Sequence, residues 1–299
     1  MKKEQTNSVS LSYMGKSEIN KGVLFFNTGS SCLLRLFVSV FSLRRYYDGN
    51  IGVLLNSDDE LNKEIEKNLT LLNVQTYYFN KPELNCKRNG GYTIKPYVLS
   101  QSPFDHTMFV DSDTIFCSKV SDFFDFIEKY DLVITPYKDW ITTGRKINGR
   151  IMRFADLFSP EELKKIIEYK FAINTGVVGY SKNTKEFFEE WVRKTFEGQG
   201  RFIVDELIAQ CICYKYKHYL ADQTWNYSCR NIKFDMAKVI HFHGRKHARL
   251  HKCQSAMIWI NTFIDFVNSG VIDKEFEQKI INSDRQVRKC KIYETYINV

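Results

Sequence analysis

The sequence predicts an α/β fold in which a mainly parallel sheet is sandwiched between helices. Short apolar runs alternate with helix-like segments through the first half of the 299-residue chain, at the spacing of β-α-β-α-β units. Two of these runs end in polar residues, Asn27-Thr28-Gly29 and Asp111-Ser112-Asp113, and open α/β sheets bind ligands at such strand ends. A content of 43% hydrophobic and 15% aromatic residues is sufficient for a substantial core.

The first half of the chain supplies the expected parallel strands. Val23 to Phe26 is typical of a buried strand, and Ser30 or Ser31 is placed to cap a helix that runs to about Tyr47. The next elements are expected to be a strand over 51–55, a helix opening at 57–59, a strand over 74–79, a helix over about 93–101 after a Gly-Gly turn, and the strand that carries two aspartates.

The second half is less regular. The expected elements are a helix over 120–129, a strand over 132–135, a basic loop around 142–153, a strand over 171–180, a helix over 184–196, a short strand over 239–242, and a helical extension that begins over 256–268. Long loops in compact domains are usually functional or disordered, so the basic loop is expected to be a lid or a substrate-specific insertion.

The composition excludes several classes of protein. No apolar run approaches the roughly 20 residues that span a bilayer, so no transmembrane segment is expected. The first 21 residues are polar and lack a secretory signal pattern. The eight cysteines include no CxxC pair, and Cys211, Cys213 and His218 are poorly spaced for zinc, which favours reduced core thiols. A cytoplasmic location is therefore expected.

The net charge of +8 is concentrated partly in the basic run 245–252. Such a run is usually a solvated surface, while nucleic acid, an anionic membrane or a diphosphate substrate are the functional alternatives. No aromatic and basic nucleic-acid-binding module is recognisable, so no nucleic-acid partner is expected.

The stretch from Met108 to Phe116 carries the most informative motif. On a strand, Asp111 and Asp113 would face the same side and form a metal clamp. A solvated turn is disfavoured by the apolar flanks. A phosphatase of the haloacid dehalogenase type is a distant alternative, because the fifth motif position is Ile115, the strand is not the first, and no later acidic pair completes that site. In the remaining interpretation, the acids hold a divalent cation that bridges the two phosphates of a nucleotide-sugar donor.

Five segments in order resemble the motifs of the GT-A glycosyltransferases, and most closely those of the retaining family 8, which includes glycogenin. The resemblance covers roughly residues 21 to 247, and Asp205-Glu206 stands where the family usually has Asp-Gln. The five segments are Thr93-Ile94-Lys95, Ser102 to Thr114, Phe171 to Val177, Asp205-Glu206 and His241-Phe242-His243-Gly244. The resemblance implies a polar tail over 1–20, a GT-A catalytic domain over 21–252 and a helical C-terminal extension over 253–299.

The resemblance implies that Asp111, Asp113 and His241 ligate the metal. Carboxylate and phosphate oxygens suit Mg²⁺ or Mn²⁺, and the imidazole favours manganese. The donor's nucleotide and diphosphate would be bound by Asn27, Thr28, Lys95, Ser112, Gly244, Arg245 and Lys246. Ordinary surface charge is the alternative for Arg245, and a helix-entry turn is the alternative for Asn27 and Thr28.

The same resemblance places Asn174 and Asp205 in the sugar pocket. Glu206 would supply a charge beside the anomeric centre or a base for the acceptor, and an acidic pair at a helix N-terminus is its structural alternative. The sequence thus predicts a metal-dependent transfer of a sugar from a nucleoside diphosphate, with UDP favoured, to a hydroxyl of a glycan, protein or small molecule. Retention is favoured over inversion, and a homodimer is one option for the assembly.

Two further alternatives remain. One is a binding protein that kept the fold and lost catalysis, against which the three intact metal-ligand positions argue. The other is a nucleotidyltransferase, which normally carries a basic Gly-rich loop after the first strand, whereas residues 27–31 contain no basic residue.

Overall fold

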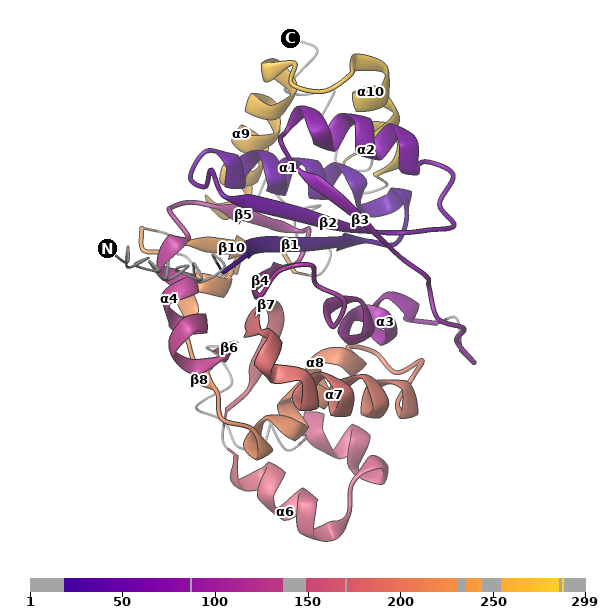
Figure 1. Ribbon diagram of the computed structural model, residues 1–299, viewed down its shortest axis with the longest axis vertical. Helices are drawn as coiled ribbons and strands as arrows, with labels where there is room; N and C mark the ends of the chain where they lie inside the picture. The colour runs from indigo at the N-terminus through magenta and orange to yellow at the C-terminus, as the bar shows by residue number, and fades with distance from the viewer. Residues whose placement is uncertain are drawn as a thin grey trace, which may run out of the picture.

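The computed structural model describes residues 19–86, 88–136, 149–169, 171–230, 235–243, 254–284 and 287. Within them, one sheet has the strand order β3-β2-β1-β4-β7-β6-β8, and a smaller sheet has the order β5-β10-β9 (Figure 1). The strands are β1 (Lys21–Asn27), β2 (Asn50–Asn56), β3 (Gln75–Phe79), β4 (His106–Val110), β5 (Thr114–Phe116), β6 (Leu132–Pro136), β7 (Ile173–Ser181), β8 (Tyr219–Leu220), β9 (Tyr227–Ser228) and β10 (Val239–His241).

Helices cover both faces of the large sheet, as the predicted α/β sandwich requires (Figure 1). The described helices are α1 (Leu33–Arg44), α2 (Asn62–Leu71), α3 (Gly90–Leu99), α4 (Ser121–Tyr130), α6 (Pro160–Glu168), α7 (Lys185–Glu197), α8 (Val204–Ile212), α9 (Gln254–Ser269) and α10 (Lys274–Ser283). No helix in this part of the chain is long and apolar enough to cross a bilayer.

The direction of β7 determines what the sheet can place together. Strands β1 to β4 of the large sheet run parallel, which confirms the prediction of a mainly parallel sheet. Strand β7 runs antiparallel to both of its neighbours, β4 and β6. The start of β7 therefore lies at the same edge of the sheet as the ends of β1 and β4.

Alternating side chains divide the core into two layers. In β4, Met108 and Val110 face the layer that contains α1, α2 and α4, while Phe109 faces the layer that contains α6, α7 and α8. In β1, Leu24 likewise packs against α3, on the face opposite to its neighbour Val23. Because successive strand residues face opposite sides, these runs are apolar at nearly every position, as expected for strands buried on both faces.

The C-terminal helices belong to the first of these layers. Helix α9 and helix α10 pack on α1, where Phe41 meets Phe266 and Phe37 meets Phe276 in edge-to-face contacts. Figure 1 shows both helices, in yellow, beside α1 and α2. The end of α10 also reaches the start of α1, because the buried Asp284 carboxylate pairs with Arg35 at 3.1 Å.

Three details of the expected elements are wrong. Neither Ser30 nor Ser31 caps α1 with its side chain, because residues 30–32 form a 3-10 turn before the helix begins at Leu33. Helix α2 begins at Asn62 rather than at 57–59, since the Asp59 carboxylate accepts from the Leu61 amide and holds a turn there. The two aspartates lie after β4 rather than on it. Most of the basic loop, residues 142–148, lies outside the described residues.

Candidate functional site

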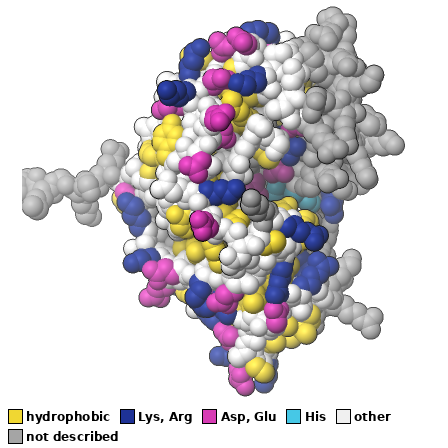
Figure 2. Space-filling view, turned by 90° about the vertical axis from the view of Figure 1, so that its right-hand side faces the viewer, with side chains coloured by type: hydrophobic (Ala, Val, Ile, Leu, Met, Phe, Trp, Pro, Cys, Tyr) yellow, Lys and Arg dark blue, Asp and Glu magenta, His cyan; other side chains and the backbone are white. Residues whose placement is uncertain are grey.

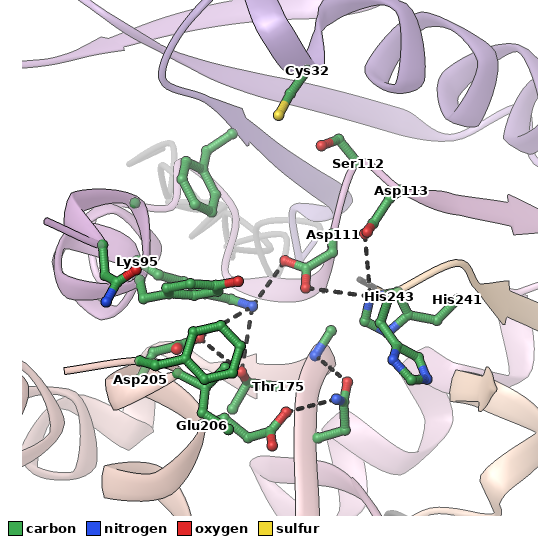
Figure 3. A pocket seen from close by; sticks show the side chains of 18 of the residues that line it. Cys32, Lys95, Asp111, Ser112, Asp113, Thr175, Asp205, Glu206, His241 and His243 are labelled. Carbon is green, nitrogen blue, oxygen red and sulfur yellow. Dashed lines mark hydrogen bonds and ion pairs between the residues drawn. The ribbon is translucent and has the colours of Figure 1, made fainter. Parts of the chain in front are cut away.

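Several polar segments converge at the edge of the sheet where β1 and β4 end. They surround a cavity of about 730 Å³ that is lined by side chains from β1, α3, the β4–β5 link, β7, α8 and β10. Figure 3 shows Asp111, Asp113 and two histidines on one side of this cavity, and the two α8 carboxylates, Asp205 and Glu206, on the other. Figure 2 shows histidine atoms, in cyan, recessed near the middle of the surface and close to charged side chains. The cavity lies at the strand ends where α/β sheets usually bind ligands.

Asp111 and Asp113 converge through a turn and not through strand alternation. They occupy the link between β4 and β5, and the Thr114 hydroxyl closes this link by donating to the Asp111 carbonyl at 2.9 Å. The Asp111 amide donates to the Gly176 carbonyl at 2.8 Å, and the Phe242 amide donates to the Asp113 carbonyl at 2.8 Å. The backbone therefore ties both acids to the neighbouring strands β7 and β10.

His241 completes a group of three side chains that could hold a metal ion. Its Nε2 lies 3.1 Å from Asp113 Oδ1 and 3.7 Å from Asp111 Oδ2. One ligand atom from each residue can be chosen so that all lie within 4.8 Å of one another. Two carboxylates and one imidazole are a donor set that fits Mn²⁺ and also accommodates Mg²⁺.

The other imidazole nitrogen is held by Asn226. His241 Nδ1 lies 2.9 Å from Asn226 Oδ1, an acceptor, so Nδ1 donates its proton to Asn226 and Nε2 faces the acids. Burial lowers the pKa of His241, but the Asp113 and Asp111 carboxylates raise it above its usual value overall. A cation bound between these three side chains would take the place of the proton that Nε2 carries in the charged ring, and Nδ1 would keep its own.

Gly176 provides the space that the imidazole occupies. A Cβ at this position would lie 2.3 Å from His241 Cε1 and 2.4 Å from Nδ1, which is too close for any side chain. The glycine of the Asn174-Thr175-Gly176 segment is therefore required by the packing of His241 against the start of β7.

Lys95 lies between the Asp111, Asp113 and His241 group and the acids of α8. Its Nζ lies 2.8 Å from Asp111 Oδ1, 3.4 Å from Thr175 Oγ1 and 3.6 Å from Asp205 Oδ2 (Figure 3). Burial lowers the pKa of this lysine, yet the Asp111 and Asp205 carboxylates more than compensate and raise it overall. Lys95 is therefore a fixed positive charge between the two groups of acids.

Asp205 is buried and incompletely satisfied. Its Oδ2 accepts from the Thr175 hydroxyl at 3.0 Å, while Oδ1 has no hydrogen-bond partner within the described residues. Burial raises the pKa of Asp205 to about 6, although Lys95 acts in the opposite direction. A buried polar atom without a partner is costly unless a ligand satisfies it, so Oδ1 is placed to receive a hydroxyl.

Glu206 is held at both carboxylate oxygens. Arg150 pairs with Oε1, and Asn174 Nδ2 donates to Oε2 at 2.6 Å. Both side chains of the Arg150–Glu206 pair are nearly buried, at 8% and 11% exposed. A register shift between β6 and β7, near Thr135 and Asn174, interrupts the ladder at this point, and such shifts are common beside active sites.

The remaining predicted site residues lie in different surroundings. Asn27 is buried with its Oδ1 unpartnered among the described residues, and Thr28 and Ser112 also line the cavity. Gly244, Arg245 and Lys246 lie outside the described residues.

Two site residues were missed by the sequence analysis. Asn226 belongs to none of the predicted motifs, and Arg150 lies in the segment predicted to be a basic loop. Asn226 is hydrogen-bonded to His241, Asn174 and Thr135, which lie 15, 52 and 91 positions away in the sequence. No local pattern therefore identifies it.

We predict that Gly176→Ala weakens Mn²⁺ binding at least tenfold. The added methyl would push His241 away from the acids, and overpacking would cost about 1–3 kcal/mol of folding free energy. The measurement is Mn²⁺ titration by electron paramagnetic resonance, with Gly149→Ala as the matched control because a Cβ at that exposed glycine meets no atom of the described residues within 4 Å. Equal Mn²⁺ affinity in a folded Gly176→Ala protein would contradict the packing argument.

A second prediction concerns the buried ion pair. Arg150→Ala should lower the free energy of unfolding by about 3–5 kcal/mol, because it leaves the Glu206 carboxylate buried without its counter-charge. Adding Glu206→Gln should recover much of this loss, since the amide keeps an acceptor for Asn174 and carries no charge. Urea unfolding of both variants measures the effect. If the double variant were no more stable than Arg150→Ala, the charge would not be the cause.

Comparison with known proteins rests on structure alone, because no family model and no curated protein sequence matches the chain. The galactosyltransferase LgtC, solved with donor and acceptor sugar analogues, matches with a TM-score of 0.59 over 86% of this chain and 99% of its own, at 13% identity. The glycosyltransferase GlyE of Streptococcus pneumoniae TIGR4 gives 0.56 over 88% of this chain and 64% of its own, at 13% identity. Mouse xyloside xylosyltransferase 1 gives a TM-score of 0.50 over 75% of this chain and 97% of its own, at 12% identity. The chain therefore has the GT-A fold of these glycosyltransferases, as its motifs predicted.

Proposed function

We propose that this protein is a metal-dependent glycosyltransferase that moves a sugar from a nucleoside diphosphate, most simply a UDP-sugar, to an acceptor hydroxyl. The observation that carries the proposal is the arrangement of the cavity. Asp111, Asp113 and His241 group their ligand atoms on one side as a candidate cation site, and Asp205 and Glu206 lie across Lys95 on the other. The GT-A fold supports this assignment.

The cation site is assigned to the diphosphate. Asp111, Asp113 and His241 would hold Mn²⁺ or Mg²⁺, which when bound supplies positive charge to the leaving nucleoside diphosphate. Lys95 adds a positive charge of its own beside Asp111, in a buried place where charge interactions are strong. Asn27 and Thr28, at the end of β1, are assigned to the nucleoside.

The acids of α8 are assigned to the transferred sugar. The unpartnered Asp205 Oδ1 would accept a hydrogen bond from a sugar hydroxyl. Glu206 is a weaker candidate for a base, because Arg150 and Asn174 occupy its two oxygens. This pairing favours retention, in which the leaving phosphate takes the acceptor's proton, over inversion, which needs a free carboxylate base.

The proposal predicts Mn²⁺-dependent hydrolysis of a nucleotide sugar in the absence of acceptor. A panel of UDP-, GDP-, ADP- and CMP-sugars, with and without Mn²⁺, should identify at least one donor. Asp113→Ala should then lower turnover at least about a hundredfold and weaken Mn²⁺-dependent nucleotide binding, because the cation loses a ligand. Calorimetric titration with UDP measures the binding.

The matched control is Asp125→Ala, which removes an exposed acid from α4 and should leave both readouts unchanged. Circular dichroism checks that each variant is folded. Metal-independent turnover, or unchanged nucleotide affinity in a folded Asp113→Ala protein, would refute the metal assignment. A folded wild-type protein that neither hydrolyses a donor nor binds a nucleotide would refute the enzyme assignment.

A further inference from the structure

An exposed pair of aromatic side chains lies at the mouth of the cavity. Tyr92 from α3 is 37% exposed, and Phe202, which precedes α8, is 60% exposed. Their ring centroids are 5.7 Å apart, and the planes meet edge to face at 86°. Both residues line the same cavity as the site described above. We call this pair the aromatic rim.

The segments that carry the aromatic rim are bonded to each other. Asn89 Nδ2 donates to the Gly200 carbonyl at 3.0 Å, and the Cys86 amide donates to Gln199 Oε1 at 3.3 Å. A Cβ at Gly200 would lie 2.7 Å from Cys86 Sγ, so the two segments approach closely. The aromatic rim is therefore a preformed feature that joins two distant parts of the chain.

The backbone around the aromatic rim is strained. Ile203 has a φ of 51°, which is a rare conformation for a β-branched residue, whereas the φ of 56° at Asn89 is one that asparagine tolerates. The left-handed turn at Ile203 separates the exposed Phe202 from the buried Val204, where α8 begins. Asp205 and Glu206 then lie in the first turn of the helix and line the cavity. Strain of this kind persists where the surrounding structure overdetermines it, and it often marks a ligand-binding site.

The chemistry of the aromatic rim fits one face of a sugar ring. A pyranose carries C–H groups on one face and hydroxyls at its edge. The C–H groups bear a partial positive charge that complements the negative face of an aromatic ring. Two aromatic rings beside a polar cavity can thus hold a sugar's apolar face while its hydroxyls reach toward Asp205 and Glu206.

We propose that the aromatic rim is the acceptor-binding site and that the acceptor is a carbohydrate, bound through the C–H face of a pyranose. This inference rests on the proposed glycosyltransferase function. The rim is assigned to the acceptor because it lies at the solvent-exposed mouth and adjoins the sugar side of the cavity. The residues assigned to the nucleoside lie elsewhere, since Asn27 ends β1 and Thr28 follows it.

The direct test is saturation-transfer NMR on the full chain with UDP and Mg²⁺, since Mn²⁺ would broaden the signals. The probes are the methyl β-glycosides of glucose, galactose and N-acetylglucosamine, with a serine-containing tetrapeptide as the competing acceptor class. Saturation is expected at the ring C–H protons of at least one glycoside. Phe202→Ala and Tyr92→Ala should each reduce it several-fold.

The kinetic test uses the donor identified by hydrolysis and the glycoside that binds. Phe202→Ala should raise the acceptor KM about tenfold with a small change in kcat, as expected for one lost aromatic contact. Phe202→Leu should resemble Phe202→Ala, because it keeps apolar area but loses the ring. Phe171→Ala removes an aromatic that is as exposed as Tyr92, at 37%, and that does not line the cavity, so it should behave as the wild type.

The outcomes separate this inference from the proposed function. Donor hydrolysis with saturation of the peptide alone, or an unchanged acceptor KM in Phe202→Ala, would overturn the aromatic rim and leave the transferase intact. Full activity in Phe202→Leu would also overturn it, since apolar area alone would then suffice. If the protein neither hydrolyses a donor nor binds a nucleotide, the transferase proposal is refuted. Saturation transfer to a glycoside, measured in the absence of nucleotide, would still decide whether the aromatic rim binds a sugar.

Discussion

The contact between His241 and the two aspartates is the interaction on which the rest of the site depends. Two carboxylates of like charge share one end of a cavity, and that arrangement is unfavourable unless positive charge lies between them. Nε2 of His241 lies 3.1 Å from Asp113, and the Lys95 ammonium lies 2.8 Å from Asp111. A bound divalent cation would complete this compensation. The acids, the imidazole and the lysine are therefore one electrostatic unit.

The fold serves this unit by bringing strand ends together. Because β7 is antiparallel to β4, the first residues of β7 lie beside the residues that follow β4. The Asp111 amide therefore donates a hydrogen bond to the Gly176 carbonyl. Because Gly176 has no side chain, the imidazole can pack against this strand. The first turn of α8 then adds Asp205 and Glu206 on the opposite side. The two halves are joined by Lys95, so a substrate between them would contact both.

Much of this arrangement follows from the sequence, because strand runs and short motifs are local features. The buried strands and the order of the motifs were predictable from these patterns, and the grouping of Asp111, Asp113 and His241 was predictable from the resemblance of the motifs to a known family. The pairing of the two acids through strand alternation was wrong, since the Thr114 hydroxyl closes a turn after β4 that an apolar run does not reveal. The partners that hold the site, Asn226 behind His241 and Arg150 against Glu206, arise from contacts between distant segments, which a single sequence does not specify. The positive φ of Ile203 is likewise imposed by tertiary packing on a residue that disfavours it.

The central claim, that these three side chains hold one cation, is tested most directly by crystallography. Crystals grown with UDP and Mn²⁺ would be measured at the manganese absorption edge, where the anomalous signal identifies the metal. The account predicts one strong peak within bonding distance of Asp111, Asp113 and His241 Nε2, with His241 Nδ1 still bonded to Asn226. A peak elsewhere in the cavity, or nucleotide bound without any manganese between these residues, would contradict it.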